Sequence, residues 1–188
     1  MKIPRESVME IPRRELTGQE IYHLVDALQI SNFRGVFCAD EIPPPSGSKN
    51  PKSQSQSQEP FEKECGILNF QKHTQGGSHW TAWYKNGKDI VYYDSYGGVP
   101  PPALAEYLNP YGWIKRSVVI TQQGPTECGG LCLYVLQALT RGRHYGQILE
   151  KLVQRRRNST GAARRLVAPH PLYGMETGVG KGASRSAT

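Results

Sequence analysis

The sequence contains no long run of apolar residues. No stretch approaches the roughly 20 consecutive apolar residues of a membrane-spanning helix, and residues 1–6 lack the apolar core of a secretory signal peptide. We therefore expect a soluble protein that is not secreted. The 188 residues, of which 37% are hydrophobic, suit one globular domain with irregular additions.

Cysteine is also scarce. The chain has only Cys38, Cys65, Cys128 and Cys132, which are too few and too irregularly spaced for a disulfide framework. No Cys-x-x-Cys pair indicates a zinc site. We expect reduced thiols in an intracellular, reducing compartment, where one of them is available as a nucleophile.

The body of the chain has no excess of either charge. Residues 151–188 hold eight of the 23 basic residues and one of the 16 acidic residues, which leaves fifteen of each sign in residues 1–150. The net charge of +7 therefore comes from the C-terminal end. Such a basic arm suggests an acidic partner, and DNA is the first candidate because the arm gains affinity by releasing phosphate counterions. Solubilisation of a disordered end is the alternative.

Two segments have few apolar side chains to bury in a hydrophobic core. Residues 43–60 are rich in proline, serine and glutamine, and residues 155–188 are rich in glycine, serine, alanine and arginine. These compositions predict a mobile loop and a disordered tail. We expect one domain over residues 1–154, which includes the 43–60 loop, followed by a basic tail over residues 155–188.

The remaining sequence shows patterns of helices and strands. Thr17 and Glu20 form a capping box for an amphipathic helix within residues 15–30. Apolar residues at helical spacing predict a buried helix over residues 126–139 that packs against a sheet. Shorter helices are predicted over residues 100–108 and 145–154, and strands over residues 66–70, 79–84, 89–94 and 117–121.

The dipeptide Asn86-Gly87 predicts a β-hairpin, because a type I′ turn needs positive φ at both central residues. With these two residues as the loop, His79 lies directly opposite Asp94. Directly opposed residues have Cβ atoms about 4.5–5.5 Å apart, which lets the imidazole donate a hydrogen bond to the carboxylate. This contact orients an imidazole and stabilises its cation, as a general base requires. An ordinary polar pair at a sheet end is the alternative.

Cys128 lies in or near the first turn of the predicted buried helix, where the helix dipole favours a thiolate. Gly129 and Gly130 follow it, although glycine costs about 0.8–1.0 kcal/mol relative to alanine inside a helix. Space for a substrate backbone above the sulfur would explain both glycines. Gln122 closes the preceding predicted strand, where its amide is placed to stabilise an oxyanion. A buried structural cysteine is the alternative reading of Cys128.

The order of these residues resembles the adenovirus-type and ubiquitin-like-protein-specific cysteine proteases. The matching residues are His79-Trp80, Asp94, Gln122 and Cys128-Gly129. Over roughly residues 15–155 the chain looks most like the adenain-type proteases of small DNA viruses and Polinton-like elements. The resemblance implies an α+β, papain-like fold of the adenain type, with a central, mainly antiparallel sheet flanked by helices and a buried helix that carries the nucleophile.

The resemblance also implies roles for these residues. His79 is the general base, Asp94 orients it, Cys128 is the nucleophile and Gln122 is the oxyanion donor, with Gln123 as the alternative donor. No cofactor or metal is required, and DNA is a candidate activator.

The implied function is that of a cysteine endopeptidase that cleaves viral capsid or core precursors during virion maturation, in the host nucleus or the virion. An activating peptide is a further candidate partner. The alternatives are a deubiquitinase-like or deSUMOylase-like isopeptidase and an inactive scaffold that binds capsid or DNA.

Overall fold

A computed structural model describes residues 10–42, 63–70 and 79–159 of the chain. The predicted 43–60 loop and the tail beyond Ser159 lie outside the described residues. The described elements follow one another as α1 (Gly18–Ala27), β1 (Phe33–Cys38), β2 (Lys63–Asn69), β3 (Trp80–Asn86), β4 (Asp89–Tyr93), α2 (Pro102–Leu108), a 3₁₀ turn (Asn109–Tyr111), β5 (Ile114–Arg116), α3 (Cys128–Thr140) and α4 (Tyr145–Ser159).

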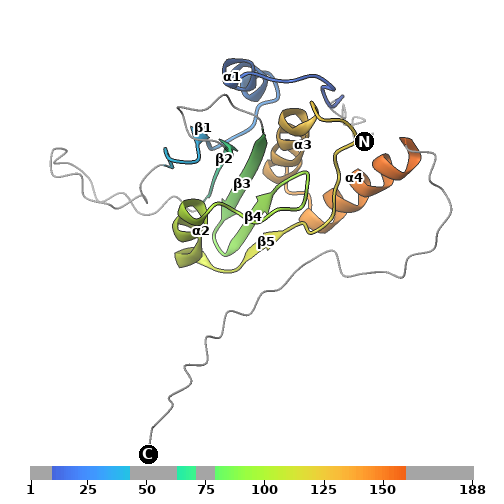
Figure 1. Cartoon of the computed structure of the whole chain (residues 1–188). Coiled ribbons are helices and arrows are strands. Elements are labelled where there is room, and N and C mark those ends of the chain that lie inside the picture. The colour runs from blue at the N-terminus through green and yellow to red at the C-terminus, as the bar shows by residue number, and fades with distance from the viewer. Residues whose placement is uncertain (1–9, 43–62, 71–78, 160–188) are drawn as a thin grey trace, which may run out of the picture.

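The five strands form one mixed sheet in the order β1-β2-β3-β4-β5. The two central pairings, β2 with β3 and β3 with β4, are antiparallel. The two outer pairings, β1 with β2 and β4 with β5, are parallel. The structure thus confirms the predicted α+β class, with a central sheet flanked by helices (Figure 1).

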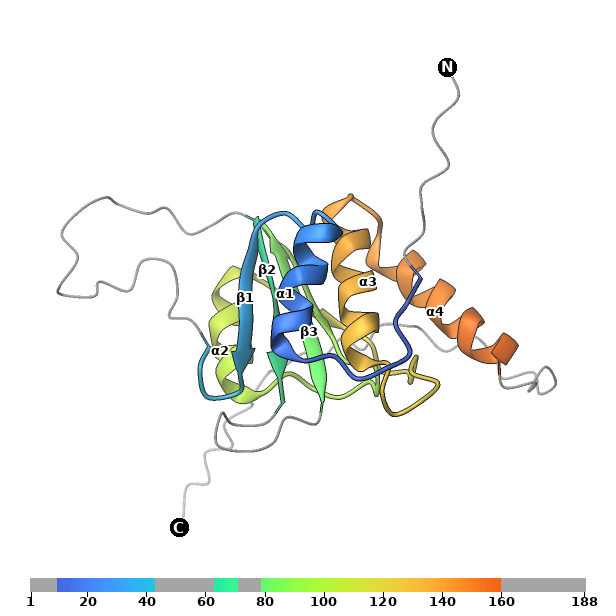
Figure 2. The same ribbon diagram turned by 90° about the horizontal axis from the view of Figure 1, so that it is seen from above.

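Each face of the sheet packs on its own hydrophobic core. Side chains that alternate along β3 and β4 divide between the faces, as the period-two geometry of a strand requires. On one face Ala82, Tyr84, Val91 and Tyr93 pack with residues of α1, α3 and α4. On the other face Trp83, Ile90 and Tyr92 pack with α2. Figure 2 shows α2 on one side of the strands and α1, α3 and α4 on the other.

Helix α3 lies in the middle of the larger core. Its residues from Cys128 to Leu139 are all buried, so it is enclosed on every side and not only on the face toward the sheet. The predicted helix over residues 126–139 is therefore present, but its first residue is Cys128, with Glu127 as the N-cap. The predicted capping box of Thr17 and Glu20 is also present at the start of α1.

The hairpin between β3 and β4 has a different register from the predicted one. Asn86 pairs with Asp89, so the loop consists of Gly87 and Lys88, and among these residues only Gly87 has a positive φ, of 56°. Asn86 remains extended because it also pairs with Lys63 of β2. Pairing on both sides of the strand outweighs the turn preference of Asn86-Gly87, and the register moves by two residues.

The predicted strand over residues 117–121 is absent. Its place at the sheet edge is taken by β5, which pairs with β4 through residues 114–116. After Arg116 the chain leaves the sheet, and the Ser117 hydroxyl donates to the carbonyl of Val119 and accepts its N–H in a local turn. The β-branched residues Val118 and Ile120 are exposed. The strand propensity of these two residues is therefore not sufficient to form a strand here, since neither side chain packs in a core.

The boundary predicted at residue 154 falls inside a helix. Helix α4 continues to Ser159, and Arg155 on it forms an ion pair with Glu127 at 2.8 Å. Arg155–Arg157 therefore belong to the folded domain and not to the tail, since the ion pair and the helical hydrogen bonds hold them. Among the described residues, no helix is both long enough and apolar enough to cross a membrane.

Candidate active site

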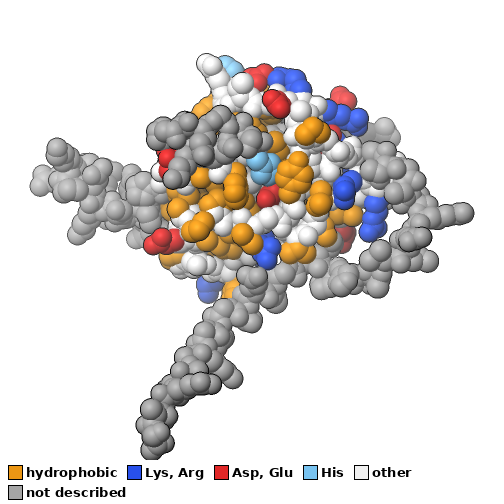
Figure 3. Space-filling view, in the orientation of Figure 1, with side chains coloured by type: hydrophobic (Ala, Val, Ile, Leu, Met, Phe, Trp, Pro, Cys, Tyr) orange, Lys and Arg blue, Asp and Glu red, His pale blue; other side chains and the backbone are white. Residues whose placement is uncertain are grey.

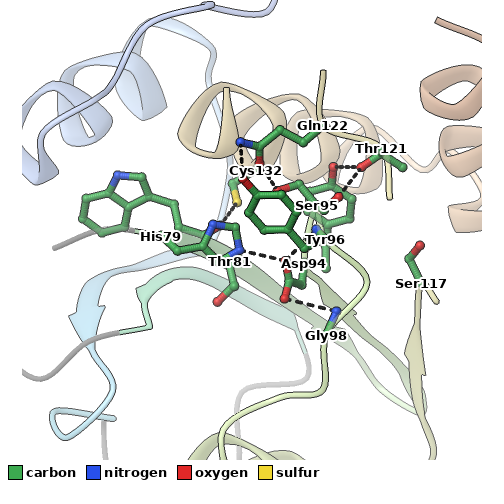
Figure 4. A network of polar contacts seen from close by, with 12 residues as sticks. His79, Thr81, Asp94, Ser95, Tyr96, Gly98, Ser117, Thr121, Gln122 and Cys132 are labelled. Carbon is green, nitrogen blue, oxygen red and sulfur yellow. Dashed lines mark hydrogen bonds and ion pairs between the residues drawn. The ribbon is translucent and has the colours of Figure 1, made fainter. Parts of the chain in front are cut away.

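A histidine and an aspartate meet where the β3–β4 hairpin opens. The Nε2 atom of His79 lies 2.7 Å from Oδ1 of Asp94. Both residues lie one position outside the strands, since β3 begins at Trp80 and β4 ends at Tyr93. Their side chains are 16% and 7% exposed, so the pair is largely shielded from water. Figure 4 shows this contact with the surrounding polar network.

The Asp94 carboxylate is held by the loop that follows β4. The backbone N–H of Tyr96 donates to Oδ1 at 2.8 Å, and that of Gly98 donates to Oδ2 at 3.2 Å. Burial raises the pKa of Asp94, but the hydrogen bonds from His79 and these two amides outweigh it and lower the pKa below its ordinary value. A side chain at Gly98 would collide with Oδ2 of Asp94. The glycine therefore lets the loop wrap around the carboxylate.

Cys128 is the first residue of α3, and its thiol contacts the same imidazole. Burial raises the pKa of Cys128, but a hydrogen bond from His79 outweighs it, with help from the backbone N–H groups of Trp80 and Gly129. The net effect lowers the pKa of the thiol. The helix N-terminus adds a positive dipole end at the sulfur. This environment favours a thiolate, the nucleophilic form of cysteine.

His79 is correspondingly stabilised as a cation. Burial alone lowers the pKa of the imidazole, but hydrogen bonds to Asp94 and Cys128, together with their charges, raise it to about 9. The imidazolium and the thiolate therefore stabilise each other, and Asp94 is the second partner of the imidazole. The structure brings together three of the four residues to which the sequence assigns catalytic roles.

The fourth residue, Gln122, lies beside this group. The backbone N–H groups of Thr121 and Gln122 both donate to the carbonyl of Ser95, which follows Asp94 directly. The Gln122 side chain is buried, its Oε1 accepts from the Ser95 hydroxyl, and its Nε2 donates to the Tyr96 hydroxyl at 3.2 Å. Gln123 faces another part of the molecule, since its Nε2 donates to the carbonyl of Arg155 at 3.0 Å.

The two glycines after Cys128 have a different role from the predicted one. A Cβ on Gly129 would lie 3.2 Å from Leu16 and from the Trp80 ring, and a Cβ on Gly130 would lie 2.7 Å from the carbonyl oxygen of Pro12. The absence of a side chain at both glycines therefore lets residues 11–16 pack closely against the start of α3. The prediction that they leave space for a substrate backbone is wrong, because the nearest atoms belong to that segment and to Trp80.

Two residues of the site were missed in the sequence. Tyr96 contacts three of the four candidate residues, and its place two positions after Asp94 was the available signal. Glu127, directly before Cys128, has a side chain only 4% exposed. It pairs with Arg155 and accepts the backbone N–H of Gln123, and these contacts lower its pKa against the opposing effect of burial. An acid before the nucleophile gave no sequence signal, since its partner lies 28 residues away.

The other cysteines differ from Cys128. Cys132 is fully buried, its thiol donates to the Trp80 carbonyl at 3.3 Å, and burial raises its pKa. Burial also raises the pKa of Cys38 and that of Cys65, the latter to about 12. Of the four thiols, only that of Cys128 has a lowered pKa.

Figure 3 shows hydrophobic side chains gathered around a histidine and an acidic side chain on the face seen in Figure 1.

No known protein family matches the chain, and no curated protein is similar to it in sequence. Among solved structures, the chain is similar to the crystal structure of the ASFV pS273R protease, with a TM-score of 0.48 and 16% sequence identity. The similarity covers 78% of this chain and 68% of that one. The choice among functions therefore rests on the geometry of the site.

Proposed function

We propose that the chain is a cysteine endopeptidase with Cys128 as nucleophile, His79 as general acid and base, Asp94 as the residue that orients and charges His79, and Gln122 as an oxyanion donor. The observation that carries this proposal is the imidazole held between a carboxylate 2.7 Å away and a thiol whose pKa it lowers. A nucleophile, a base and a residue that orients the base are the parts that covalent acyl transfer requires.

The reaction follows from these positions. The Cys128 thiolate attacks a peptide carbonyl carbon, a C–S bond forms, and the carbonyl oxygen becomes an oxyanion. When the C–N bond breaks, imidazolium gives its proton to the leaving amine. Water then loses a proton to His79 and adds its oxygen to the acyl carbon. The C–S bond breaks, which releases the new carboxylic acid and restores the thiolate and imidazolium, and the acid then loses its proton to the solvent.

Two donors are proposed for the oxyanion. One is the backbone N–H of Cys128 at the N-terminus of α3, and the other is the side-chain amide of Gln122. Gln122 is preferred over Gln123 because Gln122 donates to Tyr96, whose ring contacts His79, whereas Gln123 donates to Arg155 on α4. The proposed chemistry uses no cofactor.

The proposed substrates are viral capsid or core precursor proteins, cleaved in the host nucleus or the virion during particle maturation. This part of the proposal rests on the resemblance of the sequence to adenain-type proteases. The isopeptidase and the inactive scaffold are the outcomes against which it is tested.

The test combines covalent labelling with substrate cleavage. A peptide vinyl sulfone should add one probe per chain, on Cys128, and both Cys128→Ala and His79→Ala should abolish the addition. Cys38→Ala is the matched control, because Cys38 is partly exposed but has a raised pKa, and this variant should still be labelled. Cleavage of capsid-precursor peptides supports the endopeptidase. Cleavage only at the C-terminal amide of a ubiquitin-like modifier would indicate the isopeptidase, and no labelling would indicate the scaffold.

We also propose that the basic C-terminal end binds DNA and acts as an anchor or activator. Outside the described residues, positions 160–188 contain four basic residues and one acidic residue. A chain that ends at Ser159 keeps α4 and the Arg155–Glu127 ion pair, so it is the appropriate truncation. Removal of four cations should lower the slope of log K against log salt by up to about 4. Unchanged DNA affinity at low salt would refute this role.

A further inference from the structure

Tyr96 contacts three of the four proposed catalytic residues. Its backbone N–H donates to Asp94 at 2.8 Å, its ring centroid lies 5.0 Å from that of His79, and its hydroxyl accepts a hydrogen bond from Gln122 Nε2. Figure 4 shows the ring beside the imidazole, with Gln122 next to its hydroxyl. Tyr96 is nevertheless 51% exposed, so burial in the core does not explain its position.

The contacts of Gln122 show what the Tyr96 hydroxyl contributes. Oxyanion stabilisation needs the N–H side of the amide, and not its oxygen, to point toward the reacting carbonyl. The amide oxygen is turned to the Ser95 hydroxyl, and one amide hydrogen is turned to the carbonyl of Gly124. The other hydrogen is turned to Tyr96, at a longer distance of 3.2 Å.

The hydrogen shared with Tyr96 points to a side chain whose ring contacts the His79 imidazole. It also has the longer of the two donor contacts, so it is the hydrogen that a developing oxyanion takes most readily. A phenol oxygen that accepts this bond fixes the amide before the substrate arrives and lets the hydrogen turn to the oxyanion afterwards.

We propose that Tyr96 is a positioning residue of the active site: its hydroxyl holds the Gln122 amide in the orientation that donates to the oxyanion, and its ring holds the plane of the His79 imidazole. The inference rests on the proposed peptidase function and extends it to a residue outside the Cys-His-Asp-Gln set. Tyr96 acts through Gln122 and His79 and needs no contact with the reacting atoms.

The hydroxyl role is tested by Tyr96→Phe, which keeps the ring. We expect kcat on a cleaved peptide to fall about five-fold, the effect of one neutral hydrogen bond, with KM unchanged within about two-fold. Tyr22→Phe is the matched control: Tyr22 is 47% exposed and its hydroxyl also accepts one N–H, from Val36, away from the site. This control should keep the wild-type kcat.

A double-mutant cycle with Gln122→Ala separates positioning from general stability. If the hydroxyl acts through the amide, Tyr96→Phe should have no further effect on kcat once Gln122 is alanine. An equal fall in both backgrounds, or a Tyr96→Phe protein with wild-type kcat, would overturn the inference about the hydroxyl. Tyr96→Leu, which also removes the ring, should lower kcat below the value of Tyr96→Phe, and equal values would overturn the role of the ring.

The same assay distinguishes this inference from the proposed function. A wild-type protein that neither cleaves peptides nor labels at Cys128 would overturn both. An active wild type that Tyr96→Phe and Tyr96→Leu match in kcat would overturn only the role of Tyr96.

Discussion

His79 and Asp94 form a hydrogen bond of 2.7 Å although neither residue belongs to the β-ladder that brings them together. The last described pair of that ladder is Ala82 with Tyr93. The imidazole and the carboxylate therefore meet at the open end of the hairpin, where the imidazole also contacts a third group. That group is Cys128 at the start of a buried helix.

Removing either member of this pair should reduce catalysis. We expect His79→Ala to lower kcat/KM by about 10²–10⁴-fold, the usual contribution of a general acid and base. Asp94→Asn should cause a smaller fall, because the imidazole stays in place but loses the charge that stabilises its cation. Asp89→Asn, at the other end of the same hairpin, is exposed and should leave kcat/KM unchanged. A fully active Asp94→Asn would contradict the role of Asp94.

The raised pKa of His79 should make stability depend on pH. The folded-state pKa is about 9 against an ordinary value of 6.5, so the folded protein holds this proton more tightly than the unfolded chain. The resulting stabilisation is fully present below pH 6.5 and is lost as the pH rises through about 9. The lowered pKa of Cys128 acts in the opposite direction, because the folded protein releases that proton more readily than the unfolded chain. In urea unfolding between these pH values, Cys128→Ala, which lacks the opposing thiol, should therefore lose more stability than the double variant Cys128→Ala/His79→Ala. Equal losses would show that His79 has an ordinary pKa.

The Glu127–Arg155 ion pair should stabilise the loop that carries Gln122. Arg155→Ala leaves a nearly buried carboxylate without its closest cation, and we expect the free energy of unfolding to fall by about 3 kcal/mol. Lys151→Ala on the same helix removes an exposed cation and should change it by less than about 0.5 kcal/mol. Equal effects of the two substitutions on urea unfolding would contradict a structural role for the ion pair.

Gly130 should be required for the packing of the N-terminal segment. Gly130→Ala places a Cβ 2.7 Å from the Pro12 carbonyl, and we expect a net loss of about 1–2 kcal/mol in the free energy of unfolding, because overpacking outweighs the gain in helix propensity. Gly124→Ala is the control, since its Cβ would meet no atom within 4 Å. A Gly130→Ala protein as stable as this control in urea would show that the segment moves aside at no cost.

The sequence predicts the contact between His79 and Asp94 correctly, although the predicted register of the hairpin is wrong. Side chains alternate along a strand with a period of two, and the observed register differs by two residues. The shift therefore left both side chains on the same face of the hairpin. Extended by one pair beyond Ala82 and Tyr93, the observed register places Asp94 opposite Thr81, two residues along the chain from His79.

Other features depend on contacts that local patterns do not contain. The β-branched residues around Val118 suggested a strand, but residues 114–116 occupy the sheet edge. Gly129 and Gly130 suggested an open site, but residues 11–16 pack against them. The Arg155 pairing with Glu127 extends the domain beyond the predicted boundary. In the last two cases the contacting residues are distant in sequence, and only the fold identifies them.

The most direct test of the central claim is the pH dependence of Cys128 alkylation by iodoacetamide, followed by mass spectrometry of the Cys128 peptide. The lowered thiol pKa predicts that the inflection of the wild-type rate lies below the ordinary thiol value, and that His79→Ala moves the inflection up toward that value. A wild-type profile that rises only near that ordinary value, and that His79→Ala does not change, would contradict the imidazolium–thiolate pair and with it the proposed function.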